Sequence, residues 1–145
     1  MENKIKLLAN SKAMSVSTTR YTTRNISGSD FFRTFIQKPL CERKDAADKL
    51  VNKFPDRIPV LVDKVYKSPL SDIDKHKFLV PSDITIGKFM YELRKHIAVT
   101  SEQAIFLFIN NTLPPTASLI STIYHTHKNE DNFLYITYAG ENVFG

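Results

Sequence analysis

The sequence predicts an α+β fold in which one mixed sheet is covered by helices on both faces. After residue 57, short stretches with the two-residue period of strands alternate with stretches that have the period of helices. The first strand stretch is apolar on both faces, so the sheet needs cover on both sides. Two helical segments precede that strand and can supply the second layer.

The two N-terminal helices are predicted from caps, apolar stripes and prolines. The stretch SDFFRTFIQ predicts a short amphipathic helix with Ser29 or Asp30 as its N-cap. Pro39 ends it and suits the first turn of a second helix over about 39–53. The following FPDR ends that helix, because the residue before a proline avoids the helical region. The apolar stripe of the second helix comprises Leu40, Ala47, Leu50, Val51 and Phe54.

The stretch RIPVLVDKV predicts the first strand. Ile58, Val60 and Val62 face one side of the sheet, and Pro59 and Leu61 face the other. A proline cannot donate to a ladder, so this strand is not expected to be hydrogen-bonded on both sides along its whole length.

The stretch DKHKFLVPSDIT, residues 74–85, predicts an edge strand. It sets two lysines and a histidine against four apolar residues and then reaches a proline. A central strand would tolerate neither the charges nor the proline. We expect this edge to be open to a strand from another protein.

The remaining elements complete the order strand, strand, helix, strand, short helix, strand. TIGKFMYELRKHI has a helical stripe, with Thr85 as cap, and SLISTIYHTH predicts a short helix over about 118–126. AIFLFI, apolar throughout, predicts a strand in the middle of the sheet beside the first strand, and NFLYITYA predicts the last strand. The order is that of a ubiquitin-like β-grasp with a four-stranded mixed sheet and two additional N-terminal helices.

The domain boundaries follow from composition. Residues 1–28 are basic and rich in Ser and Thr, which predicts a disordered extension, although IKLLANSKAM could form a helical turn on a partner. The helical pair spans 29–54, the core 55–140 and a flexible tail 141–145. The chain has no apolar run of about 18 residues and no secretory segment, which indicates a cytoplasmic protein.

The composition excludes several kinds of site. The single cysteine, Cys41, rules out an intrachain disulfide, and its place on a predicted helix indicates packing. The four histidines do not have metal-ligand spacing, and we expect no metal, no cofactor and no enzymatic activity. The net charge of +5 favours acidic partners, but without an arginine-rich block we expect no nucleic-acid binding.

Four separated motifs carry a family resemblance: KFPDRIPVLVDK, DIDKHKFLVPSDITIGKFM, FLFINNTLPPT and NFLYITYAGENVFG. In order and spacing they resemble the ubiquitin-like autophagy modifiers, the GABARAP and light-chain-three family, over about residues 30–145. The resemblance implies conjugation of a C-terminal glycine, Gly145, to phosphatidylethanolamine on autophagosomal membranes. It implies activating and conjugating enzymes and a processing or deconjugating cysteine protease as partners. It also implies adaptors and cargo receptors that carry an aromatic-x-x-aliphatic motif beside acidic residues.

The resemblance also implies two peptide pockets and a cationic rim. By themselves, the same residues could simply pack helix against sheet. The first pocket would be lined by Leu50, Pro59, Leu61, Lys77, Leu79 and Phe133. The second pocket would be lined by Phe78, Val80, Pro81, Ile84 and Phe89. The rim would be Arg57, Lys75 and Arg94.

This sequence departs from the family pattern at three positions. Ala46 stands where an acid is common, and Glu92 stands where an aliphatic residue usually lies beside the second pocket. His96 stands where the family has a basic residue.

Other functions stay open at this stage. A related autophagy modifier is conjugated to a protein lysine and shares the fold and the terminal glycine. A basic scaffold that binds tubulin or nucleic acid through the N-terminal tail and lysines would show a steep salt dependence and would need residues 1–28. A cysteine hydrolase would need Cys41, for which the sequence offers no nucleophile–base pair.

Overall fold

The computed structural model describes residues 6–7 and 28–141 of the 145-residue chain. Both predicted N-terminal helices and the predicted order of elements after residue 57 are confirmed. The elements in chain order are β1 (Lys6–Leu7), α1 (Asp30–Phe35), α2 (Leu40–Lys53), β2 (Arg57–Lys64), β3 (Lys77–Pro81), α3 (Ile86–Leu93), the 3₁₀ turn η1 (Arg94–His96), β4 (Phe106–Phe108), α4 (Ile120–His127) and β5 (Leu134–Ala139).

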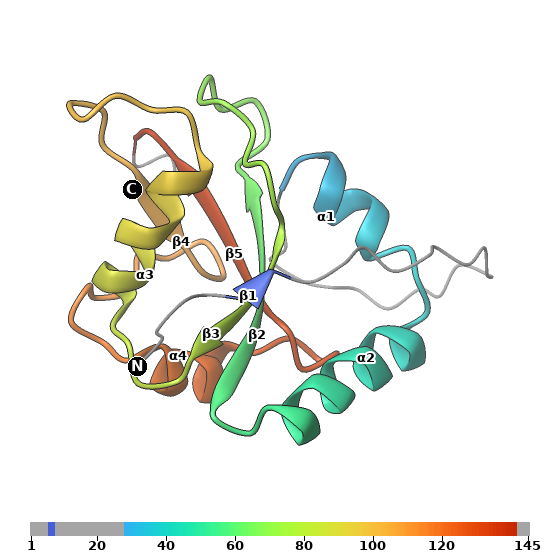
Figure 1. Cartoon of the computed structure of the whole chain (residues 1–145). Helices are drawn as coiled ribbons and strands as arrows, with labels where there is room; N and C mark the ends of the chain where they lie inside the picture. The colour runs from blue at the N-terminus through green and yellow to red at the C-terminus, as the bar shows by residue number, and fades with distance from the viewer. Residues whose placement is uncertain (1–5, 8–27, 142–145) are drawn as a thin grey trace.

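The strands form one mixed sheet in the order β1-β3-β2-β5-β4 (Figure 1). β2 pairs antiparallel with β3 and parallel with β5, and β4 pairs antiparallel with β5. The last four strands in that order are the predicted β-grasp sheet. The two-residue β1, which we did not expect, extends this sheet beyond β3.

The position predicted for the AIFLFI strand is wrong. β4, which carries this stretch, lies at an edge of the sheet, and β5 takes the central place beside β2. Both faces of β4 are nevertheless covered. Leu107 belongs to the large core cluster, whereas Phe108 packs with Val65 and Ala139 in a smaller one. An apolar run therefore indicates that both faces of a strand are buried, and it does not indicate that the strand is central in the sheet.

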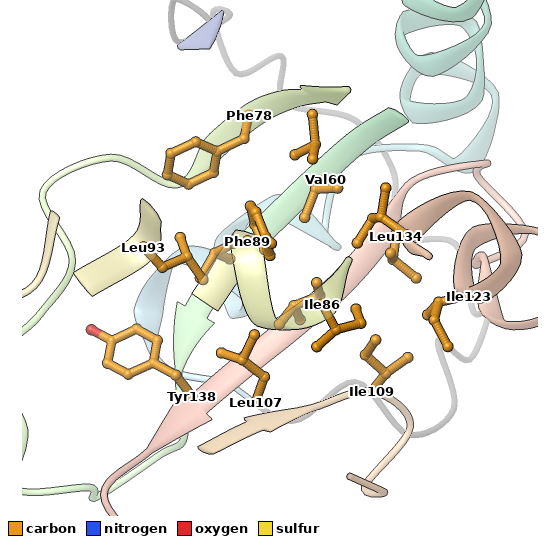
Figure 2. Close-up of a cluster of buried hydrophobic side chains, with 14 of the residues drawn as sticks. Val60, Phe78, Ile86, Phe89, Leu93, Leu107, Ile109, Ile123, Leu134 and Tyr138 are labelled. Carbon is orange, nitrogen blue, oxygen red and sulfur yellow. The ribbon is translucent and has the colours of Figure 1, made fainter. Parts of the chain in front are cut away.

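One face of the sheet is covered by α3 and α4 (Figure 2). Ile86, Phe89 and Leu93 of α3 are at most 1% exposed, which confirms the helical stripe as far as Leu93. Ile97, the last residue of the predicted stretch, is buried but extended, after the 3₁₀ turn η1. The hydroxyl oxygen of Thr85 caps this helix by accepting a hydrogen bond from the Lys88 backbone N–H at 3.1 Å. The strand residues in the same cluster include Ile58, Val60, Val62, Phe78, Val80, Leu134, Ile136 and Tyr138.

The other face is covered by α1 and α2. Phe32 and Phe35 of α1 and Ala47 of α2 are buried with Leu61 and Tyr135 from the sheet. Leu61 thus lies on the face opposite Val60 and Val62, as the alternation along the first strand predicts.

Three further expectations have different outcomes. Cys41 is exposed, so the expectation that it packs is wrong, because it lies on the outer side of α2. The predicted disorder of residues 1–28 and flexibility of 141–145 fall almost wholly outside the described residues; within the extension, Lys6 and Leu7 are in a strand. Residues 6–7 and 28–141 contain no helix that is both long and apolar enough to cross a membrane.

Candidate functional site

The candidate site is the outer edge of β3. The Val62 N–H donates to the His76 carbonyl at 2.8 Å, and hydrogen-bonded pairs alternate along an antiparallel ladder. The backbone groups of Phe78 and Val80 therefore face β2. Those of Lys77 and Leu79 face away from β2, toward the edge. The missing N–H of Pro59 costs the sheet no hydrogen bond. Pro59 lies opposite Leu79, in a pair that is not hydrogen-bonded, and it precedes Val60, where the pairing of β2 with β5 begins.

The expectation that this edge is open is wrong for this structure. β1 lies along it, antiparallel, with Lys6 opposite Leu79 and Leu7 opposite Phe78. The physical reason is the one that made the edge a candidate site: outward-facing N–H and C=O groups on an apolar strand bind any extended segment within reach. Here a segment of the same chain is the one that pairs with them.

The residues predicted to line the first pocket gather on the α1–α2 face of the sheet. Leu61 and Phe133 lie in one buried cluster with Leu50 packed against it. Lys77 places its ammonium nitrogen 5.6 Å from the centre of the Phe35 ring. Pro59 and Leu79 are buried and lie opposite each other on β2 and β3.

The residues predicted to line the second pocket gather on the opposite face, against α3. Phe78 and Phe89 meet edge to face with ring centres 6.2 Å apart, next to Val80 and Ile84 (Figure 2 shows the two rings). Pro81, also buried, ends β3. Alternate residues of β3 thus point into two apolar layers, one on each face of the sheet.

Both sets of residues are closely packed with β1 in place. Lys77 is 8% exposed, and Phe78, Leu79 and Val80 are fully buried. A foreign aromatic ring can enter only if these side chains shift. These four residues of β3 are therefore packed on both faces of the sheet, and the two pockets remain a prediction.

Of the three residues predicted for the cationic rim, one has a contact with β3. Arg57 donates from Nη1 to the Leu79 carbonyl at 3.3 Å, so it contacts the edge strand directly. Arg94 donates to the Thr100 carbonyl at 2.8 Å, and Lys75 is exposed just before β3. Lys77 adds a fourth cation, and its burial, with the nearby charge of Lys38, lowers its pKa. An acidic group beside Lys77 would offset both effects.

The helix α1 is fixed over the end of β2 by a buried carboxylate. Asp63, which is 2% exposed, accepts hydrogen bonds from the backbone N–H groups of Phe32 at 3.0 Å and Lys64 at 2.9 Å. Burial raises the pKa of this carboxyl, against the effect of those hydrogen bonds. Phe31 stacks on the His76 ring at 4.3 Å between centres, which joins α1 to the segment before β3.

Sequence reasoning missed a buried charge network that supports the first-pocket face. Arg43 on α2 donates to the Asp131 carboxylate at 2.7 Å, and the two side chains are 1% and 0% exposed. Asp131 also accepts from the Tyr135 hydroxyl and from the Phe133 N–H. Burial and the Asp131 charge raise the pKa of Tyr135 well above its usual value, so its hydroxyl remains a donor. The only sequence pattern that could have indicated this network is the four-residue spacing of Asp131 and Tyr135. That spacing is too common in proteins to predict a buried charge.

The three departures from the family pattern lie on three different elements: Ala46 on α2, Glu92 on α3 and His96 in η1. Glu92 contacts Lys88 at 3.6 Å and Lys95 at 3.3 Å, so cations on its own side of the helix balance its charge. His96 pairs with Asp74 at 2.9 Å and meets the Phe78 ring at 5.5 Å between centres. Ala46 is exposed on α2. Gly145, the predicted conjugation residue, lies outside the described residues.

Comparison with known proteins identifies the family of this chain. The sequence model for "Autophagy protein Atg8 ubiquitin like" matches residues 42–145. The chain is 59% identical over 108 residues to autophagy-related protein 8 of Dictyostelium discoideum, covering 74% of this chain and 88% of that protein. It is 54% identical over 110 residues to autophagy-related protein 8a of Arabidopsis thaliana, covering 76% and 90%.

Two solved structures share the fold. The crystal structure of Trypanosoma brucei ATG8 is 40% identical, with a TM-score of 0.70, and the match covers 76% of this chain and 95% of that one. Plasmodium falciparum Atg8, solved in complex with a P. falciparum Atg3 peptide, is 37% identical, with a TM-score of 0.64 and coverage of 70% and 90%. The match of sequence and fold leads to one conclusion: the chain belongs to the Atg8 family of ubiquitin-like autophagy proteins, which are modifiers and not enzymes.

Proposed function

We propose that this chain is conjugated through Gly145 to phosphatidylethanolamine on autophagosomal membranes, and that it recruits adaptors there by β-augmentation along β3. The observation that carries the recruitment is the outer edge of β3, where backbone groups of Lys77 and Leu79 face outward between two apolar layers. A peptide strand on this edge would direct alternate side chains toward opposite faces. The pairing of β1 with the same edge supports its capacity to take up an added strand.

The charges around the edge support acidic peptides as ligands. Lys77 begins β3, Lys75 lies two residues before it, and Arg57 of β2 donates to the Leu79 carbonyl, while Arg94 begins the turn after α3; the chain carries a net charge of +5. Each exposed ion pair contributes only about 0.2–1 kcal/mol, whereas burial of an aromatic ring contributes roughly 1.5–3 kcal/mol. The rim therefore serves mainly to orient a peptide whose ring supplies most of the affinity.

The complex of P. falciparum Atg8 with an Atg3 peptide supports a peptide-binding role for the present chain. A conjugating enzyme that binds through such a peptide would use the same edge as the adaptors. The two kinds of partner would then compete for β3.

Conjugation at Gly145 is supported by the family match, which extends to residue 145. A glycine is the least hindered acyl donor, since it lacks a Cβ and tolerates extended geometry in a narrow enzyme channel. Mass spectrometry of the conjugate distinguishes the proposal from its nearest alternative. Phosphatidylethanolamine on Gly145 supports the proposal, and an isopeptide bond to a protein lysine contradicts it.

Reversal of one rim charge is expected to weaken peptide binding without affecting folding. Lys75→Glu should lower the affinity for a peptide with three acidic residues before Trp-x-x-Leu by about two- to tenfold, because an attraction becomes a repulsion. Fluorescence anisotropy at low and high salt measures the effect, which should shrink as salt screens it.

The matched control is Lys128→Glu, which reverses another exposed lysine at the end of α4. It should leave the affinity unchanged. Equal losses in both variants would mean that the peptide responds to net charge only, and the assignment of the rim to this edge would be wrong.

A further inference from the structure

The edge that the proposed function requires is paired with β1 in this structure. Lys6 lies opposite Leu79 and Leu7 lies opposite Phe78, in antiparallel register (Figure 1 shows β1 beside β3). Because the backbone groups of Leu79 face outward, Lys6 and Leu79 form the hydrogen-bonded pair and Leu7 and Phe78 the non-bonded one. An incoming strand on β3 would need the same outward N–H and C=O groups of Leu79.

We propose that the N-terminal segment that contains β1 is a built-in competitor for adaptor peptides, so that the chain inhibits its own peptide site until that strand is displaced. This inference rests on the proposed function, since it assumes that adaptor peptides bind along β3. The ligand that displaces β1 is an acidic peptide with an aromatic residue. Such a ligand brings the two things that a two-residue pairing lacks: a ring to bury and several charges for the rim.

The sequence of the N-terminus has the form of a weakened ligand. Ile5 and Leu8 are separated by two residues, which is the spacing of an aromatic-x-x-aliphatic motif with isoleucine in place of the ring. Glu2 supplies a single acid ahead of them. Ile5, Lys6 and Leu7 also alternate apolar and polar, as a strand with one buried face does. A segment of this kind is suited to occupy the edge and to yield to a better ligand.

The tether makes a weak pairing effective. Residues 8–27 tether β1 to the start of the helical pair, and a tether of this length gives an effective concentration on the order of millimolar. A strand with a dissociation constant of about 0.1–1 mM would then occupy the edge for about 50–90% of the time. The apparent affinity of an external peptide falls in proportion to the unoccupied fraction. Loss of the pairing is therefore expected to raise the affinity by about two- to tenfold.

The test compares Lys6→Pro with Lys6→Ala in the full chain. Proline removes the N–H that Lys6 offers to Leu79, whereas alanine removes the lysine charge and keeps the N–H. Both variants and the unmodified chain are titrated with the peptide of three acidic residues and Trp-x-x-Leu. Amide hydrogen exchange is followed by NMR for Leu79, whose N–H faces β1, and for Phe78 and Val80, whose N–H groups face β2.

The inference predicts that Lys6→Pro binds the peptide two- to tenfold more tightly and that its Leu79 amide exchanges faster. Phe78 and Val80 should keep their protection, and Lys6→Ala should match the unmodified chain in both measurements. If Lys6→Pro and the unmodified chain bind the peptide equally, β1 is no competitor and the inference fails while the proposed function stands. If neither binds, the proposed function fails and the competition fails with it. If Lys6→Ala tightens binding as much as Lys6→Pro, the effect comes from charge, and the strand account is overturned.

Discussion

Replacement of Asp131 by alanine is expected to lower the free energy of unfolding by about 3–5 kcal/mol, because it leaves the Arg43 guanidinium buried without a counter-charge. Arg43 is 1% exposed and its Nη1 lies 2.7 Å from the carboxylate. The same change removes the acceptor for the Tyr135 hydroxyl and the Phe133 N–H. Chemical denaturation followed by circular dichroism measures the loss.

A double-mutant cycle separates the ion pair from the general loss of packing. Arg43→Met leaves Asp131 as the unpaired charge and should also destabilise strongly, whereas Arg43→Met with Asp131→Ala removes both charges. The free energy of unfolding of the double variant should therefore fall by less than the sum of the two single-variant losses, with a difference of about 0.5–3 kcal/mol. Strictly additive losses would show that the two side chains do not stabilise each other. The exposed pair Lys49 and Asp45, 3.1 Å apart on the same helix, is the matched control and should give a cycle near zero.

Gly145→Ala is expected to reduce the yield of conjugate by roughly 100-fold, the scale of rate loss when a reacting group is displaced by about 1 Å. The added methyl group lies next to the carbonyl that must be transferred first to an activating enzyme and then to a conjugating enzyme. A reconstituted conjugation reaction with vesicles that contain phosphatidylethanolamine, read by gel shift and mass spectrometry, measures the yield.

Gly140→Ala is the matched control for that variant. A Cβ at residue 140 would lie 3.4 Å from Cδ2 and Cγ of Leu70, which is an ordinary van der Waals contact. The Gly140→Ala variant should therefore fold and be conjugated normally. Normal conjugation of Gly145→Ala would contradict the proposed role of the terminal glycine.

The parts of the fold that follow from local patterns could be predicted. The stripe that includes Ile86, Phe89 and Leu93, with its Thr85 cap, specified α3 because helix formation depends on neighbours three and four residues apart. The alternation of Val60 and Leu61 likewise specified which residue faces which layer. Lysines beside a short apolar strand indicated an edge, and β3 is the outermost of the four β-grasp strands, with only the two-residue β1 beyond it.

The features that depend on distant partners could not be predicted. Arg43 and Asp131 are 88 residues apart, and each alone has the character of a surface residue. The pairing of β1 with β3 depends on two residues next to a long polar stretch, where composition favours disorder. The sequence therefore predicted β3 as the outermost of the four β-grasp strands, but β1, which pairs along it, was not foreseen.

The most direct test of the central claim is a scan of the acidic Trp-x-x-Leu peptide with single backbone N-methyl groups. An added strand uses its N–H groups alternately, so methylation should abolish binding at every second residue and have little effect at the residues between. The full chain is titrated with each methylated peptide, and the shifts of Lys77 and Leu79 amides are followed by NMR. Strand addition on β3 predicts the alternating losses with shifts at those two amides. Equal affinity for every methylated peptide would contradict it, because the peptide would then bind through side chains alone.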